Sequence, residues 1–138
     1  MVKIQNQLTV YQDYISQLLE QLSINYQNTK LERQLIFKKD FSNYDEDFMP
    51  LEELELLTVN IRGYACQIED KGTVNNYKQA IAELKTLSVF NNHTIVQLYN
   101  EARSHYPQIQ SYISMLDYLR LLVLEYLQIQ QNFQPISA

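Results

Sequence analysis

The apolar residues in the first part of the chain recur at spacings that alternate between four and three positions. Two apolar residues in every seven form the stripe of a helix that packs lengthwise against another helix. This stripe consists of Ile4, Leu8, Tyr11, Ile15, Leu18 and Leu22. It weakens just before Thr29 and Glu32, which have the form of a capping box and predict a second, short helix from about Lys30 to Asp40. One helix bent near Asn28 is the alternative.

Residues 40–49 lose this periodicity and combine acidic with aromatic side chains, so we expect a loop there. A calcium site of the EF-hand type is not expected in it, because the sixth position is not glycine and the twelfth is not glutamate. Pro50 fits the first position of a third helix, and Gly72 fits the left-handed position just after its end. Gly63 inside that helix costs about 1 kcal/mol relative to alanine. Either another backbone packs closely against Gly63, or the helix is weak there.

The rest of the chain predicts three further helices. Thr73 is placed to cap a fourth helix that ends near Asn91 and Asn92, and a short fifth helix must end before Pro107. The last helix, from Pro107 to about Gln131, holds the heptad spacing longest. Its seam consists of Ile109, Tyr112, Leu116, Leu119, Val123, Tyr126 and Phe133.

Further leucines widen the apolar surface of the last helix well beyond one seam. They are Leu121, Leu122, Leu124 and Leu127. Its polar residues lie mainly on a narrow strip of Gln110, Ser114, Asp117, Arg120, Gln128 and Gln131. A helix that is apolar over most of its circumference either lies at the centre of a bundle or carries a second face for another chain. We therefore expect an all-α fold: a compact bundle of five or six helices with the C-terminal helix as its central spine, in a single domain spanning residues 1–138.

The apolar surplus of the last helix also suggests a function. It predicts a non-enzymatic interaction module, or a subunit of a larger assembly, that binds a protein partner or a second copy of itself through apolar and tyrosine-rich helix faces. The residues predicted to form this partner interface are Tyr112, Leu119, Leu122, Val123 and Tyr126 of the last helix, with Tyr11 and Leu18 of the first.

The amino-acid composition supports the helical prediction and indicates the expected cellular location. The chain has eleven tyrosines and two glycines, whereas a sheet protein of this size needs several glycines for its hairpin turns. The single cysteine, Cys66, cannot form an internal disulfide, so we expect a reducing, cytoplasmic location. The N-terminus lacks the apolar run of a signal peptide, and the most apolar stretch is interrupted by Arg120 and Glu125, so no membrane association is expected.

Catalytic and metal-binding patterns are missing from the sequence. Neither glycine belongs to a phosphate-binding loop, and no serine-hydrolase or zinc-protease string occurs. Cys66 with His93 or His105 is a conceivable thiol pair, but cysteine is more commonly a buried core residue. Glu101 and His105 have the wrong spacing for a helical di-metal site and lack a second element. We therefore expect no enzyme activity, cofactor, metal or small-molecule substrate.

Basic residues gather in one segment of this acidic chain, whose net charge is −5. Lys30, Arg33, Lys38 and Lys39 form either a phosphate-contacting patch or a solvated helix face. The tyrosine stripe offers a similar choice between base stacking and helix packing, and the seam positions of its tyrosines favour packing.

The segment from Tyr112 to Tyr126, YISMLDYLRLLVLEY, resembles the aromatic-rich closing helix of the small subunits of RNA-guided CRISPR interference complexes. That resemblance implies an alternative function, a small all-helical subunit that contacts nucleic acid within a larger complex. The residues it implicates are Lys30, Arg33, Lys38, Lys39, Arg62 and Arg103. The acidic balance of this chain differs from the usually basic surface of that family.

Overall fold

The computed structural model describes residues 2–43 and 50–132, with the side chains of 7–36 and 50–132. These residues form six α-helices and one short 3-10 helix, which confirms the predicted all-α bundle. The helices are α1 (Val2–Asn28), α2 (Lys30–Asn43), α3 (Pro50–Lys71), α4 (Tyr77–Thr86), α5 (His93–His105) and α6 (Pro107–Asn132), with the 3-10 helix η1 (Val89–Asn91) between α4 and α5.

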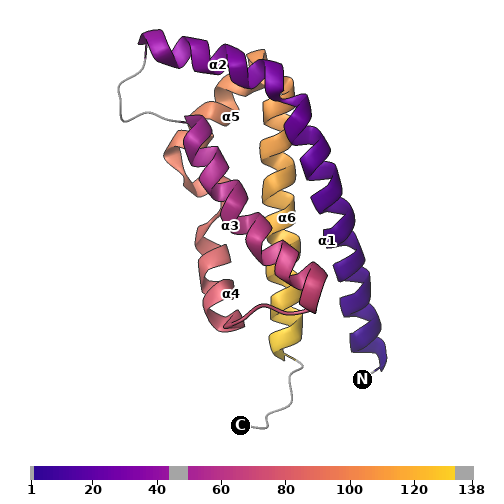
Figure 1. The fold of residues 1–138 in the computed structure, drawn as a ribbon. Helices are drawn as coiled ribbons and strands as arrows, with labels where there is room; N and C mark the ends of the chain where they lie inside the picture. The colour runs from indigo at the N-terminus through magenta and orange to yellow at the C-terminus, as the bar shows by residue number, and fades with distance from the viewer. Residues whose placement is uncertain (1, 44–49, 133–138) are drawn as a thin grey trace.

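Helix α6 is the spine of the bundle, as predicted. It contacts α1, α2, α3, α4 and α5 (Figure 1). Its inward residues Leu116, Leu119 and Val123 are completely buried. Helix α1 lies alongside α6 in the opposite direction (Figure 1), so that the two longest helices share one long face of the molecule.

The junction of α1 and α2 falls at Thr29, as the sequence predicts, but the capping box there does not form. The Thr29 hydroxyl donates back to the Tyr26 carbonyl in the last turn of α1, at 2.6 Å. The Glu32 carboxylate instead accepts from the backbone amides of Gln108 and Ile109, at 3.1 and 2.9 Å. These amides begin α6, where free N–H groups and the helix dipole favour an acceptor with negative charge. Glu32 therefore caps a helix distant from it in sequence.

The boundaries of α3 agree closely with the prediction. The loop predicted to begin at residue 40, before α3, does not begin there. Helix α2 continues through residues 40–43, and the rest of the predicted loop, residues 44–49, lies outside the described residues. Helix α3 begins at Pro50 and ends just before Gly72, which has a φ of 73°. A Cβ at Gly63 would meet nothing within 4 Å, so no backbone of the described residues packs closely against this glycine.

Helix α4 differs from its prediction at both ends. It begins at Tyr77, with Asn76 rather than Thr73 as the N-cap, and it ends at Thr86 rather than near Asn91. Asn76 adopts the left-handed conformation, with φ of 53°, which asparagine tolerates better than most residues. The remaining distance to α5 is bridged by η1.

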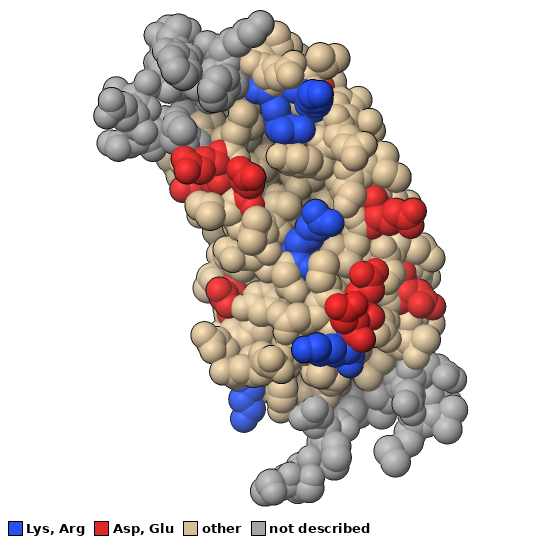
Figure 2. Space-filling view, viewed as in Figure 1, with Lys and Arg blue, Asp and Glu red and all other residues tan. Residues whose placement is uncertain are grey.

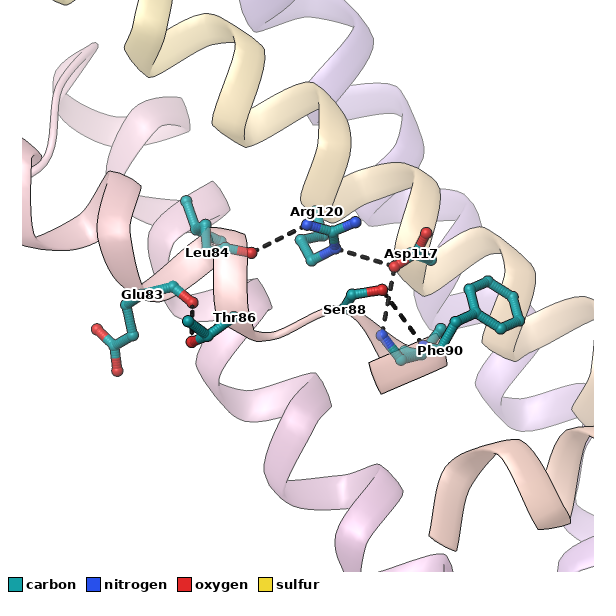
Figure 3. A network of polar contacts seen from close by, with 8 residues as sticks. Glu83, Leu84, Thr86, Ser88, Phe90, Asp117 and Arg120 are labelled. Atoms are coloured by element: carbon teal, nitrogen blue, oxygen red, sulfur yellow. Dashed lines mark hydrogen bonds and ion pairs between the residues drawn. The ribbon is translucent and has the colours of Figure 1, made fainter. Parts of the chain in front are cut away.

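The predicted polar strip of α6 is wrong at Asp117 and Arg120, which are buried. The Arg120 guanidinium donates to the Asp117 carboxylate at 2.9 Å and to the Leu84 carbonyl at the end of α4, at 3.0 Å (Figure 3). The same carboxylate accepts a longer hydrogen bond, 3.4 Å, from the Val89 amide of η1. A buried charge pair is tolerated when its remaining hydrogen-bonding groups are satisfied. Here the pair holds the segment that connects α4 to η1 against α6.

Candidate protein-binding surfaces

Six of the seven residues predicted to face a partner lie in the core of this chain. Tyr112, Leu119, Leu122, Val123, Tyr126 and Leu18 are each no more than 9 % exposed. The physical reason is that α1, α3, α4 and α5 surround the inner side of α6 and cover its heptad seam. These side chains therefore offer little free surface in this arrangement, although Leu18 and Leu122 line open cavities between α1 and α6.

Tyr11, the seventh residue, is half-buried at the edge of α1. Its hydroxyl donates to the Glu125 carboxylate of α6 at 2.7 Å. This hydrogen bond, more than burial, raises the pKa of Tyr11 above its usual value, because the carboxylate favours the protonated phenol. Tyr11 thus links α1 to α6 and keeps the Glu125 carboxylate at the junction of the two helices.

The buried tyrosines serve packing, as their seam positions predict. The Tyr126 hydroxyl donates to the Gly72 carbonyl at 2.6 Å, and so satisfies an acceptor at the end of α3. The Tyr112 hydroxyl pairs with that of Thr58 at 2.9 Å, and burial raises the pKa of Tyr112. Neither ring presents a face to solvent.

Helix α1 carries a second stripe at four-three spacing that faces solvent and has no charged residue. We call it the α1 stripe; it consists of Gln7, Val10, Tyr14, Gln17, Gln21, Ile24 and Asn28, all exposed. Its apolar members Val10, Tyr14 and Ile24 are 47 %, 54 % and 53 % exposed. Sequence reasoning found the inward stripe of this helix and missed the outward one, although the same spacing signals it.

Helix α6 has a matching outward stripe. This α6 stripe consists of Ser111, Ser114, Tyr118, Leu121, Glu125 and Gln128, and Glu125 is its only charged member. Tyr118 and Leu121 are 57 % and 46 % exposed, and with Tyr14 they line a cavity of about 670 Å³. A smaller cavity of about 180 Å³ continues between Tyr14, Gln17 and Tyr118. The two stripes and these cavities form the α1–α6 face.

A second surface, the α1–α3 groove, lies where the end of α1 and the start of α2 meet α3. Two open cavities of about 700 and 370 Å³ share Tyr26 and Glu55 as lining residues. Lys30 and Arg33 line the first cavity, and Arg62 lines the second. Figure 2 shows basic side chains on this side of the molecule, at the top and near its middle.

The predicted basic cluster is therefore only partly assembled. Lys30 is exposed and Arg33 half-buried at the α1–α3 groove, while the side chains of Lys38 and Lys39 lie outside the described residues. Arg103 is exposed on α5 and lines neither cavity of the groove.

The Arg33 side chain is held by the chain itself. Its guanidinium lies over the ring of Tyr26, 4.0 Å from the centroid, and its Nε donates to the Thr29 hydroxyl at 2.8 Å. The ring of Tyr26 also packs against that of Tyr112, with centroids 5.5 Å apart. The Arg33 guanidinium is thus held at a fixed position, and it covers one face of the Tyr26 ring.

The residues considered for chemistry do not form a shared site. Cys66 is exposed, and no histidine lines the cavity of about 350 Å³ beside it. His93 and His105 lie at opposite ends of α5, and both are exposed. Across residues 7–36 and 50–132, no three His, Cys, Asp or Glu side chains gather as a metal site would require. In the described part of the chain, no helix is both long and apolar enough to cross a bilayer.

Comparisons with known proteins return no matching family model, curated protein or solved structure. The resemblance of the last helix to the small subunits of CRISPR complexes therefore remains a prediction without further support. The function of this protein is therefore inferred from the chemistry of the α1–α6 face and the α1–α3 groove.

Proposed function

We propose that this protein is a non-enzymatic interaction module whose α1–α6 face packs against the same face of a second copy. The observation that carries the proposal is the pair of exposed, nearly uncharged stripes that run along the two longest helices. An amphipathic helix at the surface of a monomer normally presents charged residues outward. Apart from Glu125, the two stripes hold apolar side chains, tyrosines and uncharged amides or hydroxyls.

The centre of this face has the composition of a protein interface. Tyr14, Tyr118 and Leu121 lie together around one cavity, and tyrosine combines a large apolar surface with a hydroxyl that tolerates water. Polar uncharged residues such as Gln17 and Gln21 continue the face beyond that centre. Interface centres are depleted in charge and rimmed by polar groups in the same way.

The charge distribution on the α1–α6 face permits pairing with a second copy. Two chains of net charge −5 repel each other, and the repulsion is smallest through a face that carries little charge. The one carboxylate of the two stripes, Glu125, already accepts a hydrogen bond from Tyr11. Amide side chains such as Gln17 and Gln21 contain both donors and acceptors, so an amide stripe can pair with an identical stripe across a twofold axis.

Sedimentation equilibrium of the purified protein tests this proposal. We expect the wild type to sediment as a dimer and Leu121→Glu to weaken association by at least about 30-fold, as for truncation of a central interface residue. The matched control is Leu56→Glu, the same change at a leucine of α3 that is 57 % exposed and outside the face. It should remain a dimer. A monomeric wild type, or equal weakening by both substitutions, would overturn the proposal.

A further inference from the structure

We infer that the α1–α3 groove is a docking site for a short acidic segment of another protein that also carries apolar or aromatic side chains. This inference does not depend on pairing through the α1–α6 face. The helix α1 residues in the groove lie on a different side of that helix from the α1 stripe; they are Leu22, Ser23, Tyr26 and Gln27. Both surfaces can therefore be occupied at once.

The interior of the groove is largely apolar. Leu51 and Leu54 line its larger cavity, and Leu22 and Val59 line the smaller one. Val59 is 63 % exposed, so a partner that covers it removes apolar surface from water. The hydroxyls of Thr58 and Tyr112 satisfy each other within the smaller cavity. An apolar or aromatic side chain fits these walls better than a strongly hydrated group does.

The rim of the groove is cationic. Lys30, Arg33 and Arg62 border it, and none of them forms an ion pair with a carboxylate among the described residues. Among the described residues, Glu55 is the one acid that lines either cavity, and it lines both. Three positive charges that border one groove of an otherwise acidic protein are complementary to carboxylates supplied from outside. Arg33 is held in place by its contacts with Tyr26 and Thr29, so it needs little further ordering to bind one.

The same geometry favours a peptide over a single-stranded nucleic acid. Sequence-tolerant binding of single strands uses open aromatic faces on which bases stack. The Tyr26 ring is covered by Arg33 and packs against Tyr112, which is itself 1 % exposed. A continuous phosphate backbone would also approach Glu55, whereas a peptide can place separate carboxylates beside the three cations and an apolar residue between them.

Fluorescence polarisation with three labelled probes tests this assignment. The first is a short synthetic peptide that alternates Asp and Glu with Phe and Leu. The second replaces its acids by Asn and Gln, and the third is oligo(dT). We expect the acidic peptide to bind best and its affinity to fall with added salt, because rim charges contribute through screened electrostatics.

Variants with equal net charge locate the site. The double substitution Lys30→Glu and Arg62→Glu should weaken binding of the acidic peptide at least about tenfold. The control, Lys78→Glu with Arg103→Glu, changes two exposed cations outside the groove and should leave binding within about twofold of the wild type. Circular dichroism melting should be the same for both, since Lys30, Arg62, Lys78 and Arg103 are exposed.

Four results would overturn the inference. They are no binding of the acidic peptide, equal binding of the amide peptide, equal weakening by the two double variants, and tighter binding of oligo(dT) through Lys30 and Arg62. The last result would assign the groove to nucleic acid. None of the four bears on the dimer expected through the α1–α6 face, so the two proposals can fail separately.

Discussion

The two sides of α6 contain similar residues and have different environments. On the inner side, Leu116, Leu119 and Val123 are completely buried, and the neighbouring Asp117 and Arg120 are buried with them. On the outer side, Tyr118 and Leu121 remain about half exposed. The difference shows that most of the apolar surplus of α6 is used within this chain, because five other helices pack against it. What remains is a narrow stripe beside α1.

The strongest test of this comparison places one charge on each side of α6. We expect Leu116→Asp to destabilise the fold by more than about 4 kcal/mol, because it buries a carboxylate without a partner. The same change at Leu121 should alter the free energy of unfolding of the monomer by less than about 0.5 kcal/mol, since that side chain is half exposed. Urea denaturation, fitted at low protein concentration, measures both. Equal losses would show that the inner and outer sides are wrongly assigned.

Substitutions in the buried Asp117–Arg120 ion pair test whether the polar residues on the inner side of α6 contribute as much to stability as its leucines do. Arg120→Ala leaves the Asp117 carboxylate buried without its guanidinium and frees the Leu84 carbonyl, so we expect a loss of about 3 kcal/mol.

A double variant separates the pair from its parts. Asp117→Asn combined with Arg120→Ala should lose less than Arg120→Ala alone, because the uncompensated charge is gone. Thermal unfolding followed by circular dichroism provides the comparison. If the double variant is less stable than Arg120→Ala, the two residues do not act as a charge pair.

The smallest expected effect concerns the first turn of α6. Glu32→Ala removes the carboxylate that accepts from the amides of Gln108 and Ile109, and we expect a loss of about 1 kcal/mol, as for other helix caps. Glu20→Ala, an exposed acid in the middle of α1, is the control and should change stability by less than about 0.5 kcal/mol. An equal effect of the two substitutions would mean that Glu32 contributes nothing to the start of α6.

Local sequence signals were reliable where one residue dictates the backbone. Pro50 marks the start of α3 and Gly72 its end, because proline lacks the amide that a helix start leaves unpaired and glycine accepts a positive φ. Hydroxyl and carboxylate signals were less reliable. Thr73 and the pair Thr29–Glu32 match capping patterns, yet Asn76 caps α4 and Glu32 caps α6. A side-chain acceptor near several helix starts can serve any of them, and its position in the fold decides which.

The candidate surfaces show the same difference between what the sequence predicts and what only the packing of the helices decides. The sequence correctly predicts that the last helix is too apolar for one seam, but it does not say which of its sides the rest of the chain covers. The residues expected at a partner interface were therefore largely core residues, and the exposed ones are Tyr14, Tyr118 and Leu121. Similarly, Lys30 and Arg62 are far apart in sequence, and only the packing of α1 against α3 brings them to one groove.

The sequence by itself determined the helical class, most helix ends and the central position of α6. Those properties depend on residue spacing and on the conformational limits of glycine and proline, which act over a few neighbouring positions. Tertiary structure alone decided that Asp117 and Arg120 are buried, that Glu32 caps a distant helix, and that two nearly uncharged stripes lie side by side. Each of these depends on which helix faces from distant parts of the chain come into contact. The spacing of residues within one helix carries no information about such contacts.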